Sequence, residues 1–355
     1  MAIKVYTATY TGIEGEIVTV EIDISRGLPG FNIVGLADVS VKESKERVRA
    51  AIINSGFDFP VSRITVNLAP ADIKKEGSQF DLPIAMGILI ATNQITLPLG
   101  VSYLFLGELS LSGELKRIKG CLPIIIKSSE NKINNIVIPL SNQNECSIVK
   151  SVKLFPFVNL NEVVEYFKTG QMRLNENVPA DKDEAYAELD FHDVVGQESC
   201  KRAIEVAAAG GHNILMAGPP GSGKTMMAQR ISSILPKLSY EEALEVTKIY
   251  SVSGILDHEK GLITKRPFRN PHHTSTYISL VGGGSRLLPG EISLAHNGVL
   301  FLDEILEFKK STLEVLRQPL EDRVIKLSRA TGTVVYPASF MLTASLNPCP
   351  CASQV

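Results

Sequence analysis

The stretch Gly218–Thr225 reads GPPGSGKT and fits the phosphate-loop pattern G-x-x-x-x-G-K-[ST] without a mismatch. The apolar run 213–217 before it predicts a buried strand, and the apolar spacing over 226–235 predicts a helix after it. In that context glycines let backbone N–H groups wrap a phosphate chain, and the helix N-terminus adds partial positive charge. The sequence therefore predicts a nucleoside triphosphate site, which the context favours strongly over a chance glycine turn.

The loop residues have distinct predicted roles. We expect Lys224 to reach the β- and γ-phosphates and the Thr225 hydroxyl to bind Mg²⁺. The predicted nucleotide-binding residues of the loop are Gly218, Pro219, Pro220, Gly221, Ser222, Gly223, Lys224, Thr225 and Met226.

A second apolar run, 298–302, ends in Asp303 and Glu304. A buried strand that delivers two acids at its carboxyl end is the Walker B arrangement, and two such acids after a phosphate loop are better explained by catalysis than by chance. In this interpretation Asp303 joins Thr225 in holding the Mg²⁺ shell, and Glu304 polarises the attacking water.

Length and composition limit the remaining possibilities. The 355 residues suffice for two domains, and 44% hydrophobic with 21% charged residues is typical of a globular protein with substantial cores. The net charge of −2 restricts any nucleic-acid surface to a local patch. An odd number of cysteines, five, favours a reducing compartment, and we find no apolar run of membrane-spanning length. We therefore expect a cytoplasmic protein without membrane contact.

Residues 1–168 mix strand and helix patterns without the regular alternation of a parallel sheet. Period-2 alternation predicts strands at 3–10, 15–24 and 63–68. We expect further short strands at 32–36 and 135–138 and a hairpin over 104–115. An amphipathic pattern predicts a helix over 40–55, the almost wholly apolar stretch 80–91 predicts a helix buried on most sides, and we expect a further helix over 121–130. We predict an α+β domain with mixed strand pairing.

Residues 169–189 hold Gly, Asn, Pro, Asp, Lys and Glu with few apolar side chains. Such a stretch cannot bury enough apolar surface to order itself. We predict an acidic, flexible linker there and a second domain over 190–355.

Two further segments of the second domain resemble AAA+ ATPases. Segment 190–197 resembles the stretch that packs against the adenine base in that class, which implies ATP as the nucleotide and contacts from Val194, Val195 and Gly196. A helix cap plus a turn is the alternative reading of this segment, and both can hold. The apolar run 340–346 ends in Asn347, where AAA+ proteins place the sensor that orients the water. The implied catalytic residues are Lys224, Glu304 and Asn347.

Four segments of the first domain together resemble the ComM family, also called YifB or magnesium-chelatase-like; they are 35–38, 41–51, 82–85 and 107–115. The block 266–291, followed by the Walker B strand, resembles the same family and, more loosely, the magnesium-chelatase ATPase subunit. The resemblance covers nearly the whole chain. It implies an N-terminal α+β Lon-protease-like (ribosomal-S5-like) domain followed by a P-loop AAA+ three-layer α/β core.

The Lon resemblance raises proteolysis as a second function. Lon-type proteases use a Ser nucleophile at the start of a buried helix and a Lys that takes its proton. Aligning the glycines places Gln79 at the nucleophile and Leu122 at the lysine, and Leu122 cannot activate a hydroxyl. Ser78 beside Gln79 is better explained as a helix cap. We therefore predict a protease-like domain without proteolytic activity.

The family resemblance implies an ATP-driven, helicase-like motor that carries out branch migration in natural transformation. It further implies that the protein acts on single-stranded or branched DNA and that it forms a homo-oligomer, a hexameric ring. One loop contains four side chains that can donate hydrogen bonds to phosphates, as DNA contact requires: Arg266, Arg269, His272 and His273. A metal on the two histidines is less favoured, because adjacent histidines are expected to point apart. A chelatase-type ATPase that drives Mg²⁺ insertion into a porphyrin, and a non-hydrolysing nucleotide-binding scaffold, stay open.

Cys349 and Cys351 have the spacing of half a zinc site or of a redox pair. The family resemblance implies that more cysteines, an arginine finger and a helical lid follow Val355. On that basis we expect residues 1–355 alone to hydrolyse ATP slowly and assemble poorly, unless Arg317 or Arg323 supplies the finger.

Overall fold

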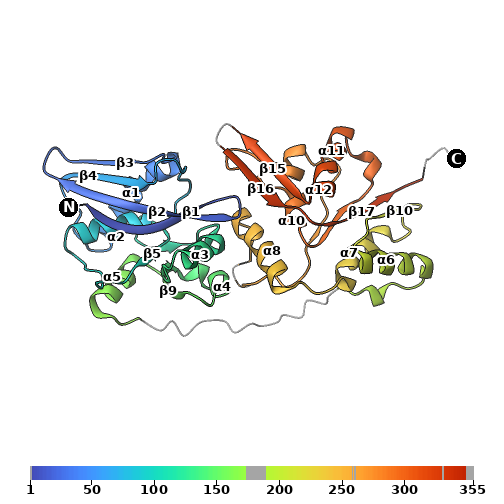
Figure 1. Cartoon of the computed structure of the whole chain (residues 1–355), viewed down its shortest axis with the longest axis horizontal. Helices are drawn as coiled ribbons and strands as arrows, with labels where there is room; N and C mark the ends of the chain where they lie inside the picture. The colour runs from blue at the N-terminus through green and yellow to red at the C-terminus, as the bar shows by residue number, and fades with distance from the viewer. Residues whose placement is uncertain (1, 173–188, 258, 260, 330–331, 349–355) are drawn as a thin grey trace. The chain divides into compact units, whose positions relative to one another are not determined.

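The structure is a computed structural model that describes residues 2–172, 189–257, 259, 261–329 and 332–348 (Figure 1). It divides into two compact units, 1–180 with 254–261 and 181–253 with 262–355. Most of the predicted linker and the pair Cys349 and Cys351 lie outside the described residues. Of the helices in the described part of the chain, none is both long and apolar enough to cross a membrane.

A mixed sheet of seven strands forms the first unit, in the order β3-β4-β2-β1-β5-β8-β9. Its strands are β1 (Ile3–Thr11), β2 (Glu14–Ser25), β3 (Gly30–Val34), β4 (Arg63–Ala69), β5 (Tyr103–Phe105), β8 (Asn135–Pro139) and β9 (Lys153–Phe157). Strand β2 pairs antiparallel with β1 and β4, and the other neighbours pair in parallel. The predicted mixed pairing is confirmed.

Helices cover both faces of this sheet because its strands alternate apolar side chains to either side. On β1, Val5 packs in the core that contains α1 and α2, whereas Ala8 packs in the core that contains α3. The helical segments of the unit are α1 (Val39–Asn54), α2 (Asp81–Ala91), α3 (Cys121–Glu130), η1 (Leu140–Asn142), α4 (Gln143–Cys146) and α5 (Leu160–Thr169). Helix α2 is buried from Asp81 to Leu89, as its apolar composition predicts.

The hairpin predicted over 104–115 is wrong in its first strand. Strand β5 lies inside the main sheet between β1 and β8, and the hairpin consists of β6 (Glu108–Leu109) and β7 (Leu115–Lys116). All three residues of β5 are buried. A strand that is apolar on both faces fits the interior of a covered sheet better than an edge hairpin.

The second unit contains a parallel four-stranded sheet, in the order β10-β17-β14-β11. Its strands are β10 (Ile214–Ala217), β11 (Phe268–Arg269), β14 (Val299–Leu302) and β17 (Met341–Leu346). Two small hairpins pair β12 (Gly282–Gly283) with β13 (Leu288–Pro289) and β15 (Val324–Arg329) with β16 (Gly332–Pro337). The parallel sheet agrees with the predicted α/β core.

Helical segments connect the strands of the second unit. They are η2 (Phe191–Asp193), α6 (Glu198–Gly210), α7 (Lys224–Ile234), α8 (Tyr240–Ser253), α9 (Tyr277–Val281), α10 (Glu291–Leu294), η3 (Ile305–Glu307), α11 (Lys310–Glu314) and α12 (Arg317–Asp322). Residues of η2, α6 and α7 pack with β10, β14 and β17 in one apolar core. This packing holds the start of α7 beside the ends of the three strands.

A buried ion pair ties together three elements of the first unit. Asp81, the first residue of α2, is fully buried. Arg47 of α1 donates to its carboxylate from Nε at 2.7 Å and from Nη2 at 3.0 Å. Ser44 Oγ and the Leu109 backbone N–H in β6 also donate to it. Burial raises the pKa of Asp81, and these hydrogen bonds oppose that shift.

We predict that Asp81→Ala destabilises the first unit, because it leaves the Arg47 charge without its partner. Removing one member of a buried pair costs about 3–5 kcal/mol of unfolding free energy, measured here by urea unfolding. Glu43→Ala is the matched control, since Glu43 is 66% exposed and lies 4.0 Å from Arg47. An exposed partner contributes less than about 1 kcal/mol. Equal stability of the two variants would contradict the structural role of Asp81.

In the second unit, His296 is a buried titratable group that joins α8 to the loop before β17. The Ser339 backbone N–H donates to its Nδ1 at 3.0 Å, so Nε2 carries the proton of the neutral ring and donates to Glu245 at 3.0 Å. Burial lowers the pKa of His296 from the ordinary 6.5, although Glu245 attracts the proton.

We predict that the second unit loses stability as the pH falls below 6.5, the ordinary pKa of His296. The folded pKa is lowered, so the unfolded chain binds the proton more tightly there and the stabilisation present above 6.5 is lost on acidification. Thermal unfolding of wild type and His296→Gln at about pH 7.5 and about pH 5.5 measures this difference. An identical pH response in the variant would show that His296 is not responsible.

Candidate nucleotide-binding and catalytic site

The phosphate loop joins the end of β10 to the start of α7, in the predicted strand–loop–helix context. Helix α7 begins at Lys224, slightly before the predicted start at Met226. Gly221 and Gly223 have φ angles of 78° and 86°, a region that residues with a Cβ rarely adopt. The loop conformation therefore requires glycine at these two positions.

The ammonium group of Lys224 is held by neutral acceptors. Its Nζ lies 2.7 Å from the Gly218 carbonyl oxygen, 3.0 Å from that of Pro219 and 3.0 Å from Asn347 Oδ1. The side chain is buried, and its charge is not neutralised by these contacts. Ser222 Oγ is a buried polar atom that has no hydrogen-bond partner among the described residues. A cation and an unsatisfied hydroxyl in one loop fit an anionic oxygen ligand.

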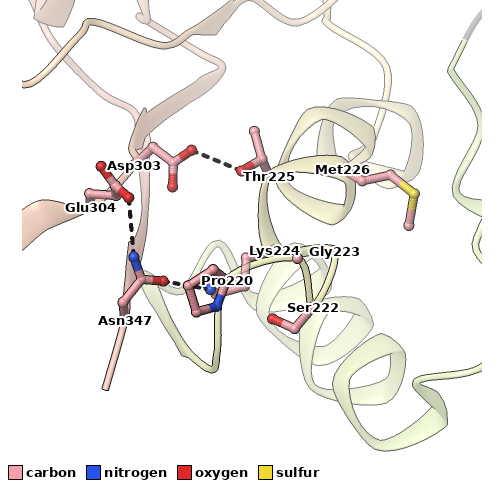
Figure 2. A pocket seen from close by; sticks show the side chains of 10 residues that line it. Pro220, Ser222, Gly223, Lys224, Thr225, Met226, Asp303, Glu304 and Asn347 are labelled. Atoms are coloured by element: carbon pink, nitrogen blue, oxygen red, sulfur yellow. Dashed lines mark hydrogen bonds between the residues drawn. The ribbon is translucent and has the colours of Figure 1, made fainter. Parts of the chain in front are cut away.

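The two acids after β14 lie opposite the phosphate loop (Figure 2). Thr225 Oγ1 donates to Asp303 Oδ2 at 2.8 Å, and Ser345 Oγ donates to Asp303 Oδ1. Asn347 Nδ2 donates to Glu304 Oε1 at 3.1 Å. The Asn347 amide therefore lies between Lys224 and Glu304, with its oxygen toward the cation and its nitrogen toward the carboxylate, as Figure 2 shows.

These side chains meet because β10, β14 and β17 are parallel, so their carboxyl ends lie at one edge of the sheet. They surround a cavity of about 330 Å³, lined by Pro220, Gly221, Ser222, Gly223, Lys224, Thr225, Met226, Asp303, Glu304 and Asn347. The hydroxyl of Thr225 and the carboxylate of Asp303 are oxygen ligands of the type that Mg²⁺ prefers. The residues present thus fit a triphosphate with its magnesium ion.

The three residues predicted to contact adenine are not among those that line this cavity. Val194 is 1% exposed and belongs to the apolar core of the unit, whereas Val195 is 93% exposed and Gly196 is also exposed. An exposed apolar side chain such as Val195 suits a flat aromatic base. The adenine contact stays a prediction.

Arg266 and Arg269, predicted to contact DNA, take part in internal contacts. Arg266 donates to the carbonyl oxygens of Pro236 at 2.5 Å and Asn297 at 2.7 Å, and to Glu242 at 3.2 Å. Arg269 forms a bidentate pair with Glu291, at 2.6 and 2.8 Å. These contacts give both arginines a structural role within the unit, and their DNA contact stays a prediction.

The two histidines of the same loop lie against each other, with ring centroids 4.0 Å apart. The expectation that their rings point apart is therefore wrong. His272 is exposed, and its Nδ1 lies 2.9 Å from Thr274 Oγ1. Among the residues that the structure describes, no group of three or more His, Cys, Asp or Glu side chains could hold a metal ion.

The residues compared with the Lon dyad are engaged in other contacts. Ser78 Oγ donates to Glu108, and α2 has Phe80 at its N-cap without a side-chain hydrogen bond, so the prediction that Ser78 caps the helix is wrong. Gln79 Nε2 donates to the Glu76 carbonyl oxygen at 2.8 Å. Leu122 is fully buried in α3. The absence of proteolysis stays a prediction.

Sequence reasoning missed Ser345, which contacts Asp303 directly. The available signal was its position two residues before Asn347 on the same predicted strand, because residues two apart on a strand share a face. A polar residue on that face, inside an apolar run, is expected close to the same site.

We predict that Lys224→Ala weakens binding of Mg²⁺–ATP, because the loop loses the cation that faces the phosphates. Loss of a hydrogen bond to a charged group costs about 1.5–3 kcal/mol, which corresponds to roughly 10- to 100-fold in Kd by titration calorimetry. Lys201→Ala is the control, since Lys201 on α6 pairs with the exposed Glu198 at 3.3 Å and should leave Kd unchanged. An unaltered Kd for Mg²⁺–ATP in Lys224→Ala would show that the nucleotide does not bind in this cavity.

Two protein-family models match the chain. One, described as magnesium chelatase, subunit ChlI, matches residues 190–355. The other, described as subunit ChlI of Mg-chelatase, matches residues 20–142. The second match lies within the first compact unit, and the first covers most of the second unit together with 254–261 of the first.

Individual relatives extend the similarity along the chain. The uncharacterized protein YifB of Salmonella typhimurium is 45% identical over 349 residues, covering 98% of this chain and 68% of that protein. Competence protein ComM of Haemophilus influenzae is 44% identical over 353 residues, with the same coverage of 98% and 68%. Lon protease 2 of Bacillus subtilis is 30% identical over 149 residues, which are 39% of this chain and 26% of that protein. The chain therefore belongs to the ComM/YifB family of magnesium-chelatase-like AAA+ ATPases.

Proposed function

We propose that this protein is an ATP-driven motor on DNA, similar to the branch-migration helicases that promote recombination of incoming DNA in natural transformation. The observation that carries the ATPase half is the meeting of Lys224, Thr225, Asp303, Glu304 and Asn347 around one cavity. The DNA half is supported by the similarity to competence protein ComM. It rests on family resemblance, since a nucleotide site does not identify what a motor moves.

In this proposal different residues of the cavity bind the phosphates, hold Mg²⁺ and activate the attacking water. Lys224 and the loop N–H groups bind the β- and γ-phosphates, while Thr225 and Asp303 hold Mg²⁺. Bound ATP supplies a phosphoryl group whose transfer to water releases free energy. Glu304 polarises that water and takes its proton, and Asn347 holds the Glu304 carboxylate through the hydrogen bond of 3.1 Å.

We place the proposed DNA contact on the loop that contains the two histidines. His272 is exposed there, whereas Arg266 and Arg269 already bind Glu242 and Glu291 and support the base of the loop. We further propose that the complete protein acts on single-stranded or branched DNA as a hexameric ring, as the family resemblance implies.

The second candidate is a chelatase-type ATPase that drives Mg²⁺ insertion into a porphyrin. The specific observation in its favour is that both matching family models describe a subunit of magnesium chelatase. The two candidates share the nucleotide chemistry and differ in the substrate that stimulates it.

We predict that forked and single-stranded DNA raise the ATPase rate of the full-length protein several-fold, while a porphyrin with Mg²⁺ leaves it unchanged. The measurement is steady-state phosphate release with each addition and with duplex DNA. Glu304→Gln is the control that should keep ATP binding and lose hydrolysis, because the carboxylate that polarises the water is gone. Hydrolysis that no DNA stimulates would refute the DNA half, and stimulation by the porphyrin would favour the chelatase. Absence of hydrolysis in the wild type would refute both.

A further inference from the structure

The hydroxyl of Ser345 contacts both acidic positions of the site. Ser345 is fully buried on β17, two residues before Asn347. Its Oγ donates to Asp303 Oδ1 and accepts a hydrogen bond of 3.0 Å from the backbone N–H of Glu304. One atom thus binds the carboxylate of the first acid and the backbone of the second.

The contact with Glu304 holds a strained stretch of backbone. Glu304 has φ 52° and ψ 53°, in the left-handed region, which costs a residue other than glycine about 1–2 kcal/mol. Strand β14 ends at Leu302, so the Glu304 N–H lies beyond the strand ladder and receives its acceptor from Ser345. This turn of the chain directs the Glu304 side chain toward Asn347, to which it is hydrogen-bonded.

The contact with Asp303 orients its carboxylate. Ser345 binds Oδ1 and Thr225 binds Oδ2, at 2.8 Å, so each oxygen has its own hydroxyl donor. Rotation of the carboxylate would break both hydrogen bonds. By binding Oδ1, Ser345 keeps Oδ2 of Asp303 directed toward Thr225, the other proposed Mg²⁺ ligand.

We infer that Ser345 is a positioning residue for ATP hydrolysis, which couples the magnesium-binding carboxylate of Asp303 to the water-polarising Glu304. The inference rests on the proposed nucleotide chemistry of this cavity. The role needs a group that donates and accepts through one atom, which a hydroxyl does and an alanine cannot. A threonine in place of Ser345 keeps that group.

Strand β17 also offers a matched control. Thr343 is fully buried on the same strand, two residues before Ser345, and its Oγ1 has no hydrogen-bond partner among the described residues. Thr343→Val therefore removes a buried hydroxyl of the same strand without removing a contact of the site. If loss of any buried hydroxyl from β17 lowers activity, Thr343→Val will show the same loss as Ser345→Ala.

The test compares Ser345→Ala, Ser345→Thr and Thr343→Val in the full-length protein. Calorimetry measures ATP affinity with and without Mg²⁺, and steady-state kinetics measure kcat and KM. In Ser345→Ala we expect unchanged metal-free affinity, a smaller gain in affinity from Mg²⁺ and a kcat lower by about 10- to 100-fold, as when a group that orients a metal ligand is lost. KM should rise by no more than the loss in magnesium-dependent affinity, so that most of the effect appears in kcat. Ser345→Thr should recover most of kcat, and Thr343→Val should match wild type.

A wild-type kcat and a wild-type magnesium response in Ser345→Ala would overturn the inference, as would equal losses in Thr343→Val. If Ser345→Ala fails to fold, Ser345→Cys replaces it with the same readouts, because a thiol is a much weaker donor and acceptor. If the wild type hydrolyses no ATP, the proposed function and the hydrolytic role of Ser345 have both failed, while the magnesium-dependent affinity of the variants still shows whether Ser345 orients Asp303 for Mg²⁺.

Discussion

The parallel pairing of β17 with β10 on one side and β14 on the other is the constraint on which the site depends. Ala217 pairs with Leu346, and Leu302 pairs with Ala344, so the three strands end at nearly the same level. Each strand is followed at once by its motif: the phosphate loop follows β10, Asp303 follows β14 and Asn347 follows β17. A shift of β17 by one residue would exchange its two faces and move Ser345 away from Asp303. Strand register, more than any single loop, therefore assembles the cavity.

The charged side chains of the cavity have neutral hydrogen-bond partners, whereas charged side chains nearby pair with opposite charges. Lys224 is bound by two carbonyls and an amide, Asp303 by hydroxyls, and Glu304 by an amide. Arg269, in contrast, is paired with a carboxylate. Neutral partners orient a charge without cancelling it, so the cavity retains charge for phosphate and metal. Paired charges such as Arg269 stabilise the surrounding structure instead.

The fold of the first unit does not depend on the residues of a Lon-type protease site. Its sheet, its two apolar cores and the buried Asp81–Arg47 pair do not depend on a serine or a lysine at the positions compared with Lon. The residues found there, Gln79 and Leu122, are themselves buried and packed. Resemblance to a protease fold is thus compatible with a role in binding or assembly, and function has to be argued from the residues at the site.

The sequence by itself determined the elements whose signal is local. The first hairpin follows from the alternation of its apolar residues, α2 from its continuous apolar run, and the phosphate loop from its glycines. The tertiary structure alone decided which groups meet across the chain. Strand β5 joins the main sheet, Arg266 reaches Asn297, and Ser345 reaches Asp303, because each depends on pairing between segments far apart in sequence. A local pattern records which way a side chain faces on its own element, and the partner on that face is set only when the strands align.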